Sequence, residues 1–125
     1  MPESWWDWPD RCRIVRVLDG DTAECVFVAD AGFRVRTEVR QIVRFWGINT
    51  DEMRDRDPVK RASAKRATEA LNVLMPPGTI CSARTIEDRD ARGRWLGVFT
   101  LADGCVVNDE MVRLGHARPY DGGAR

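Results

Sequence analysis

The chain has 125 residues, enough for one domain that buries roughly two-thirds of the surface of its unfolded form. Twenty basic and twenty acidic residues give a formal net charge of zero, which argues against a protein that coats nucleic acid through overall positive charge. The sequence has no apolar run that could span a bilayer, and it does not begin with a basic and then apolar leader. We therefore expect a cytoplasmic monomer with no membrane partner.

The first part of the chain predicts a Trp-rich extension (residues 1–10) followed by one domain (residues 11–125). We expect Trp5, Trp6 and Trp8 to clamp the extension onto that domain. Residues 12–18 are rich in β-branched side chains and stop at a turn signal, Asp19-Gly20-Asp21. A second strand follows over residues 22–29.

Residues 33–46 alternate between apolar and polar side chains, which is typical of a half-buried strand, and Arg44 therefore leaves the sheet opposite Phe45. A polar loop over residues 49–57 leads to Asp57-Pro58, which is a helix N-cap followed by proline at the first helical position. Pro76-Pro77-Gly78 ends that helix.

Two further strands are predicted over residues 79–86 and 95–101, joined by a charged loop. A short strand over residues 105–107 precedes a short helix, which we expect Asn108 to cap and Gly115 to end. Five strands with a helix after the third predict a mainly β, α+β fold, namely a Greek-key barrel of the OB type with one long and one short helix.

The cysteines are widely spaced, without a Cys-x-x-Cys pair, and His116 is the only histidine. A structural zinc site needs paired ligands at short spacing. We therefore expect buried free thiols rather than a zinc site or disulfides, and we expect His116 at the surface or at a helix end. The cysteines are Cys12, Cys25, Cys81 and Cys105.

Oxygen-bearing side chains gather at two predicted strand ends. Asp19 and Asp21 are two residues apart, so both carboxylates can point the same way. Asn49-Thr50-Asp51-Glu52 directly follows the strand that bears Arg44. Calcium prefers several oxygen ligands, and an arginine guanidinium matches two phosphate oxygens. Asp-Gly-Asp is also a common turn, so this spacing alone leaves a metal site and a plain turn both open.

Four motifs in order carry a more specific signal. They are Asp19-Gly20-Asp21-Thr22, the segment from Val43 to Glu52, the segment from Asp90 to Gly97, and the segment from Val107 to Ala117. Together, from about Arg13 to Tyr120, the chain resembles the staphylococcal nuclease (thermonuclease) family. The resemblance implies an OB-like five-stranded barrel that binds one calcium ion.

The resemblance also implies roles for individual residues. Asp21 would ligate the ion through its carboxylate and Thr50 through its backbone carbonyl. Asn49 stands where the family has a ligating Asp, and Asp19 would support the metal site. Glu52 would hold the attacking water, and Arg44 and Arg94 would grip the scissile phosphate.

The chain departs from the family at several positions. Asn49 removes one negative charge from the ion's ligands, so Mn²⁺ or Mg²⁺ are alternatives to Ca²⁺. Asp51 replaces a usual proline, and we expect its carboxylate to face solvent rather than the ion. Arg92 replaces an aromatic that neighbours substrate in the family, so we expect phosphate contact there. The sequence ends soon after Tyr120, without the family's usual final helix.

Aromatic residues offer surfaces on which nucleobases could stack. Trp46 shares its sheet face with Arg44, and Tyr120 stands near the family's substrate-side aromatics. For Trp46 and Tyr120, two roles stay open, namely stacking on a base and plain surface packing. We expect Trp95 in the core.

The sequence thus favours a calcium-dependent nuclease that hydrolyses DNA, and RNA as a second substrate, with low sequence specificity and 3′-phosphate products. One alternative is a barrel that binds single-stranded nucleic acid but has lost catalysis through Asn49 and Asp51. A more distant alternative is a small regulatory protein that binds a protein partner through its Trp-rich start.

Overall fold

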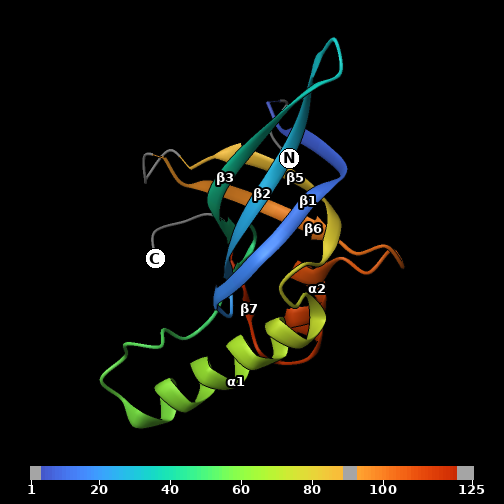
Figure 1. Ribbon diagram of the computed structural model, residues 1–125. Coiled ribbons are helices and arrows are strands. Elements are labelled where there is room, and N and C mark those ends of the chain that lie inside the picture. Colours follow the sequence, from blue (N-terminus) through green and yellow to red (C-terminus); the bar gives the residue numbers. More distant parts are fainter. Residues whose placement is uncertain (1–3, 89–92, 121–125) are drawn as a thin grey trace.

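A computed structural model describes residues 4–88 and 93–120. Its centre is a closed barrel with the strand order β1-β2-β3-β6-β5, in which β3 and β6 run parallel and the other neighbours antiparallel (Figure 1). The predicted OB-type barrel is therefore confirmed. The five barrel strands are β1 (Trp6–Asp19), β2 (Thr22–Gly32), β3 (Val35–Phe45), β5 (Ile80–Glu87) and β6 (Trp95–Thr100).

Two helices and one small sheet complete the fold. Helix α1 (Pro58–Leu74) begins as predicted, because the Asp57 carboxylate accepts a hydrogen bond from the Val59 amide at 2.9 Å. Helix α2 (Val107–Arg113) ends next to Gly115, whose φ of 81° suits glycine. Strands β4 (Ile48–Asn49) and β7 (Arg118–Pro119), which the sequence did not suggest, pair with each other.

The first strand is longer than the predicted segment 12–18. It begins at Trp6 because this end of β1 pairs with β5, Trp6 opposite Thr85. Trp5 is buried against Trp46 and Trp8 packs on Phe27, so these two residues hold the start of the chain as expected. Trp6, by contrast, is 66% exposed.

The predictions for residues 105–108 were wrong in two respects. The strand over 105–107 is reduced to a single bridge between Thr100 and Val106. Asn108 lies inside α2, whose N-cap is Val106, because the Asn108 side chain is used elsewhere. Its oxygen accepts from the Phe99 amide, and its nitrogen donates to the carbonyls of Trp46 and Gly97, all at 2.9–3.0 Å. Asn108 thus ties α2 to the ends of β3 and β6.

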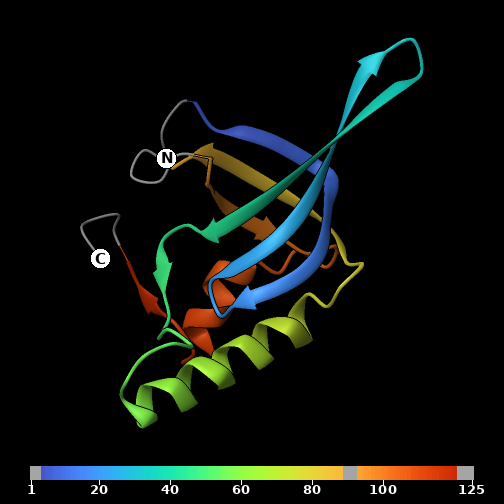
Figure 2. The same ribbon diagram turned by 60° about the vertical axis from the view of Figure 1, so that its left-hand side comes forward.

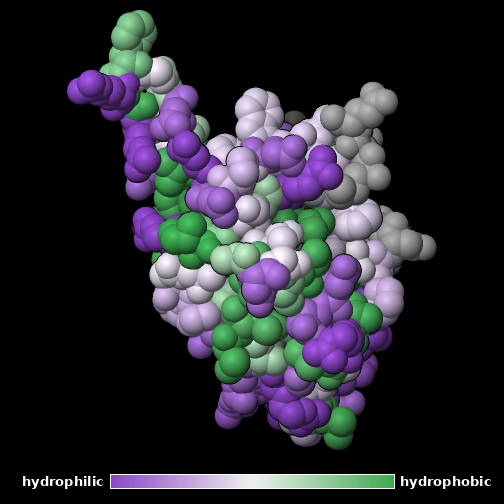
Figure 3. Space-filling model, turned by 90° about the vertical axis from the view of Figure 1, so that its right-hand side faces the viewer, coloured by the Kyte–Doolittle hydropathy of each residue, from purple (hydrophilic) through white to green (hydrophobic). Residues whose placement is uncertain are grey.

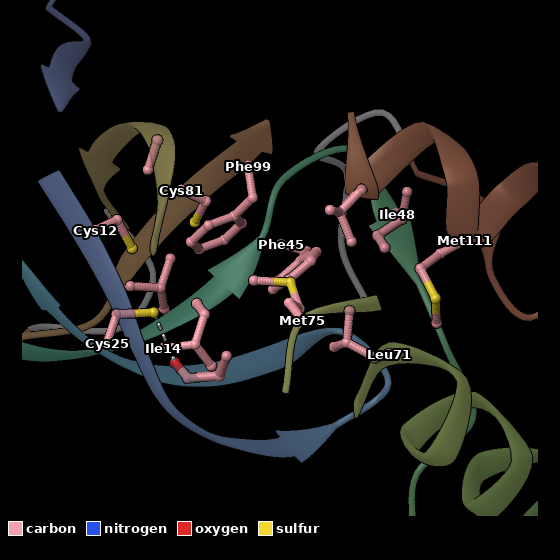
Figure 4. Packing of buried hydrophobic residues seen from close by; sticks show 14 of the residues in the cluster. Cys12, Ile14, Cys25, Phe45, Ile48, Leu71, Met75, Cys81, Phe99 and Met111 are labelled. Atoms are coloured by element: carbon pink, nitrogen blue, oxygen red, sulfur yellow. Dashed lines mark hydrogen bonds between the residues drawn. The ribbon is translucent and has the colours of Figure 1, made fainter. Parts of the chain in front are cut away.

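The core fills the barrel and the space between the barrel and α1. Figure 4 shows Ile14, Phe45, Met75 and Phe99 together with Leu71 of α1 in one cluster. Cys12, Cys25 and Cys81 are buried free thiols, as predicted. A hydrogen bond with the Cys25 thiol raises the pKa of Cys12, and one with Cys12 raises the pKa of Cys81. His116 follows α2 and donates its backbone amide to Met111, and Trp95 packs against the core.

The β1–β2 turn is pressed against α1. A β-carbon added to Gly20 would lie 2.6 Å from the Ala67 Cβ, so only glycine fits between Asp19 and Asp21. This contact fixes the acidic turn relative to the helix and to the loop that precedes it. None of the helices among residues 4–88 and 93–120 is long and apolar enough to cross a membrane.

Candidate active site

One cleft of about 560 Å³ brings together side chains from three distant parts of the chain. Pairing of Thr22 with Arg44 and a 2.7 Å hydrogen bond from the Phe45 amide to the Asp21 carbonyl join the β1–β2 turn to the end of β3. Seven of the residues singled out from the sequence line the cleft. They are Asp19, Asp21, Arg44, Thr50, Asp51, Glu52 and Arg94.

Asp21 lies at the buried side of the cleft and is 4% exposed. Its carboxylate accepts a hydrogen bond from the Thr22 hydroxyl at 3.0 Å and one from the Thr50 amide at 3.3 Å. The Arg44 Nη2 lies 3.8 Å from the same carboxylate. A buried carboxylate supported in this way is a fixed oxygen donor for a cation.

Arg44 is 5% exposed, although it leaves the sheet on the outer side. Its Nη2 lies 3.4 Å from the Asn49 Oδ1, and its guanidinium carbon lies 5.4 Å from the centre of the Tyr120 ring. A guanidinium over an aromatic face is held by a cation–π contact. The orientation of Arg44 is therefore set by Asp21, Asn49 and Tyr120 together.

The loop after β4 supplies the other acidic groups. Glu52 lies on the cleft and is exposed, so its carboxylate can reach solvent. Asp51 does not simply face solvent, contrary to expectation, because its side chain is 17% exposed and lies 3.4 Å from the Arg118 guanidinium. Arg118 belongs to β7, which pairs with β4, so this ion pair connects the small sheet to the cleft that Asp51 lines.

Arg94 is held by a residue that the sequence did not reveal. Its Nε and Nη2 donate to one oxygen of Asp88 at 3.0 and 2.6 Å. The Asp88 side chain is 8% exposed, that of Arg94 is 36% exposed, and the Asp88 amide also donates to the Arg94 carbonyl at 2.8 Å. Asp88 thus fixes both the backbone and the side chain of Arg94 at the edge of the cleft.

The groups predicted to bind the ion are the Asp21 carboxylate, the Asn49 side-chain oxygen and the Thr50 carbonyl, which are oxygen ligands of the type that a hard cation prefers. The Arg44 Nη2 lies 3.8 Å from this Asp21 carboxylate. Within residues 4–88 and 93–120, no group of three or more His, Cys, Asp or Glu side chains is arranged to hold a metal. An ion held here would therefore take one buried carboxylate, with amide, carbonyl and water oxygens completing its coordination.

Tyr120 and Trp46 lie beside the Arg44 end of the site. With Gly47 and Pro119 they line a second hollow of about 530 Å³. Trp46 is 38% exposed and meets Trp5 edge-on at 5.8 Å. A flat ligand could reach both rings from Arg44. The predicted contact residue Arg92 lies outside the described residues.

The fold and the cleft define a small OB-type barrel protein with a buried carboxylate and two held arginines around one opening. No protein-family model matches the sequence. Two proteins described as uncharacterized endonucleases, one from Escherichia coli O157:H7 and one from Escherichia coli, are each 34% identical to this chain over 122 residues. Those alignments cover 93% of this chain and 68% of each relative. The chain therefore belongs to the family of these endonuclease-named proteins.

Proposed function

We propose that the protein is a metal-dependent nuclease, with Ca²⁺ as the expected ion and Mn²⁺ or Mg²⁺ as alternatives. Its substrate is DNA, with RNA as a second substrate, cleaved with little sequence specificity to leave 3′-phosphate ends. The observation that carries this proposal is the convergence of Asp21, Arg44, Glu52 and Arg94 on one cleft. The endonuclease names of the relatives support the same reaction class.

In the proposed reaction, Arg44 and Arg94 bind the non-bridging oxygens of the scissile phosphate from two sides of the cleft. Arginine suits this task because its planar guanidinium donates two parallel hydrogen bonds and stays charged. Negative charge that develops on the phosphoryl oxygens is stabilised where it forms, without reorganisation of either side chain. Asp88 and Tyr120 keep the two guanidinium groups in place beforehand.

Glu52 orients the attacking water and accepts its proton. The new bond joins the water oxygen to phosphorus, the bond from phosphorus to the 5′ oxygen breaks, and solvent protonates the leaving oxygen. Asp21, Asn49 and the Thr50 carbonyl would hold the cation, with Asp19 in support. A bound cation supplies positive charge that neutralises the phosphate and the developing oxyanion.

The experiment is cleavage of end-labelled single-stranded DNA and of RNA in Ca²⁺, Mn²⁺, Mg²⁺ or chelator. Glu52→Gln should lower the rate by about a hundredfold or more while the thermal unfolding curve is kept. Glu69→Gln, which changes an exposed acidic residue of α1, is the matched control and should leave the rate unchanged. Full activity of Glu52→Gln, or full activity in chelator, would contradict the proposal.

One observation favours a second candidate, a nucleic-acid-binding barrel without catalysis. Asn49 offers an amide where a carboxylate would add charge, and its oxygen already lies 3.4 Å from Arg44. Calorimetry separates the two functions. Single strands that bind with no detectable heat from any of the three cations, and no cleavage, would favour the binding module.

A further inference from the structure

The hairpin formed by β2 and β3 extends well beyond the barrel. Strand β1 pairs with β2 only as far as Phe27, and β6 pairs with β3 only from Val43 onward. The intervening segment, residues 28–39, is a two-stranded arm that projects from the barrel (Figures 1 and 2). Figure 3 shows the arm standing clear of the body of the molecule, with hydrophilic and hydrophobic surface alternating along it. An isolated hairpin is at best marginally stable in water, so we expect a projecting arm to have a function.

A row of arginines follows the outer face of β3 from the arm into the cleft. Arg36, Arg40 and Arg44 are separated by four residues each and pair with Asp30, Val26 and Thr22 of β2. Side chains two or four residues apart leave the same face of a strand, so these guanidinium groups recur about every 13 Å. The row winds with the right-handed twist of the hairpin, and its last member is the arginine of the candidate active site.

Two acidic residues on this face, Glu24 and Asp30, are paired with arginines. Glu24 lies between Arg16 and Arg40, at 2.8 and 3.1 Å, and the guanidinium of Arg16 lowers the pKa of the Glu24 carboxyl. The Glu24 side chain is 13% exposed, whereas those of both arginines are 64% exposed. The carboxylate therefore lies beneath two guanidinium groups that remain open to solvent.

On the arm, the Asp30 carboxylate is also paired with two arginines, but its side chain stays 56% exposed. Asp30 lies 2.8 Å from Arg11 and 3.8 Å from Arg36, and Arg11 lowers the pKa of the Asp30 carboxyl. The outer face of β2, β3 and the part of β1 from Arg11 to Asp19 carries six arginines against four carboxylates, a formal excess of two positive charges in a chain of zero net charge. These residues are Arg11, Arg13, Arg16, Arg36, Arg40 and Arg44, with Asp19, Glu24, Asp30 and Glu38.

We propose that this arginine row is a track for the sugar-phosphate backbone of the nucleic-acid substrate, leading from the arm to the cleft. The proposal rests on the proposed function and adds how a long substrate is held. Nucleic acid is favoured over an acidic protein because the row is continuous with Arg44, and because a backbone presents phosphates at regular intervals, one per about 3.4 Å of helix axis on each strand of B-form DNA. Exposed guanidinium groups suit such contacts, since they bind phosphate in a bidentate manner.

The test variant is Arg36→Gln combined with Arg40→Gln in the full chain. Each neighbouring carboxylate keeps its closer arginine, because Glu24 retains Arg16 and Asp30 retains Arg11. Glutamine removes the charge while keeping much of the side-chain length. The control is Arg84→Gln on β5, an exposed arginine paired with Asp7 at 2.6 Å on the wall of the barrel away from β3.

Binding of a fluorescein-labelled 30-nucleotide single strand is measured against salt concentration, with Glu52→Gln in every protein to prevent cleavage. The track predicts that the slope of log K against log salt falls by about 1.4 for the double variant, with roughly tenfold weaker binding near 0.1 M salt. The Arg84→Gln control should show at most a small part of this change. Binding of a thymidine dinucleotide, which fills only the cleft, should be the same in all three proteins.

An unchanged slope in the double variant would overturn the track, and so would an equal change in Arg84→Gln. If the arm binds an acidic protein instead of nucleic acid, the salt slope of single-strand binding should be unchanged in the double variant. The test does not depend on turnover. If the wild-type protein cleaves nothing, the proposed reaction fails, whereas a reduced salt slope still establishes the track.

Discussion

Replacement of Asp88 by asparagine should impair the proposed reaction through Arg94 alone. Asp88 offers no contact to the substrate in the proposed mechanism, yet one of its oxygens accepts both Arg94 hydrogen bonds, at 3.0 and 2.6 Å. Asparagine has the same shape and keeps the backbone bond from residue 88 to the Arg94 carbonyl. The change therefore removes the charge that holds the guanidinium.

The contacts set bounds on the size of the effect. A hydrogen bond to a charged group contributes about 1.5–3 kcal/mol, but the Arg94 side chain is 36% exposed, so solvent screening favours the low end. A loss of about 1.4 kcal/mol corresponds to tenfold less of the oriented Arg94. Loss of the whole Arg94 guanidinium would lower the cleavage rate by about a hundredfold or more. A substitution that acts only through Arg94 cannot lower the rate further than this loss does. We expect a rate between tenfold and a hundredfold lower.

The assay is a double-mutant cycle on single-turnover cleavage of single-stranded DNA. Asp88→Asn should slow the wild-type enzyme by the factor above, yet change the rate of Arg94→Ala by less than about twofold. Thermal unfolding shows whether each variant is folded. Equal factors in both backgrounds would refute the reasoning, because Asp88 would then act on the reaction without Arg94.

Three further outcomes are expected. Asn108→Ala should lower the free energy of unfolding in urea by about 3 kcal/mol, since three buried hydrogen bonds are lost, and a loss below about 1 kcal/mol would contradict the role of this side chain. Asn49→Asp should strengthen Ca²⁺ binding about tenfold in calorimetry by adding a charge to the ligands; unchanged binding would exclude residue 49 from the site. Lowered pKa values of Glu24 and Asp30 stabilise the folded state above their ordinary values of 4.5 and 3.8, and this stabilisation is lost as pH falls through the lower folded-state values. The melting temperature should therefore fall in acid, less steeply in Glu24→Gln, and an identical fall would count against the Arg16 and Arg40 contacts.

The barrel and the members of the cleft could be predicted because local chemistry and long-range structure agree. Alternation over β3 placed Arg44 on the outer face, and the Asp19-Gly20-Asp21 turn lies where a glycine is required by contact with α1. Residues at strand ends on one side of a small barrel are brought close by the pairing itself. These rules place Asp21 and Arg44 near each other, whereas Arg94 was predicted only through the resemblance to the staphylococcal nuclease family.

Other features depend on tertiary contacts that leave no periodic signal. Asp88 stands in a stretch of charged residues in which neighbouring acidic side chains look equivalent, and only the bond to Arg94 distinguishes it. Strand β1 continues past Pro9 and Asp10, where the pairing with β5 shifts register and Asp10 has a φ of 52°. An irregularity of this kind is read from sequence as a strand end. Asn108 is a good capping residue by type, but its side chain instead donates to the carbonyls of Trp46 and Gly97.

The balance of charge in this chain shows why net charge alone is a poor guide to a polyanionic ligand. At physiological salt, interactions between exposed charges are largely screened beyond about 8 Å, so a phosphate responds to the side chains beside it rather than to the total. Here the carboxylates of Glu24 and Asp30 lie against guanidinium groups, and Asp21 is buried where it can face a cation. Arg16, Arg36 and Arg40, which lie beside Glu24 and Asp30, keep most of their side-chain surface exposed. A neutral chain can therefore present a cationic face to a phosphate backbone. The salt dependence of its affinity should follow the number of arginines on that face that contact phosphates, not the net charge of the chain.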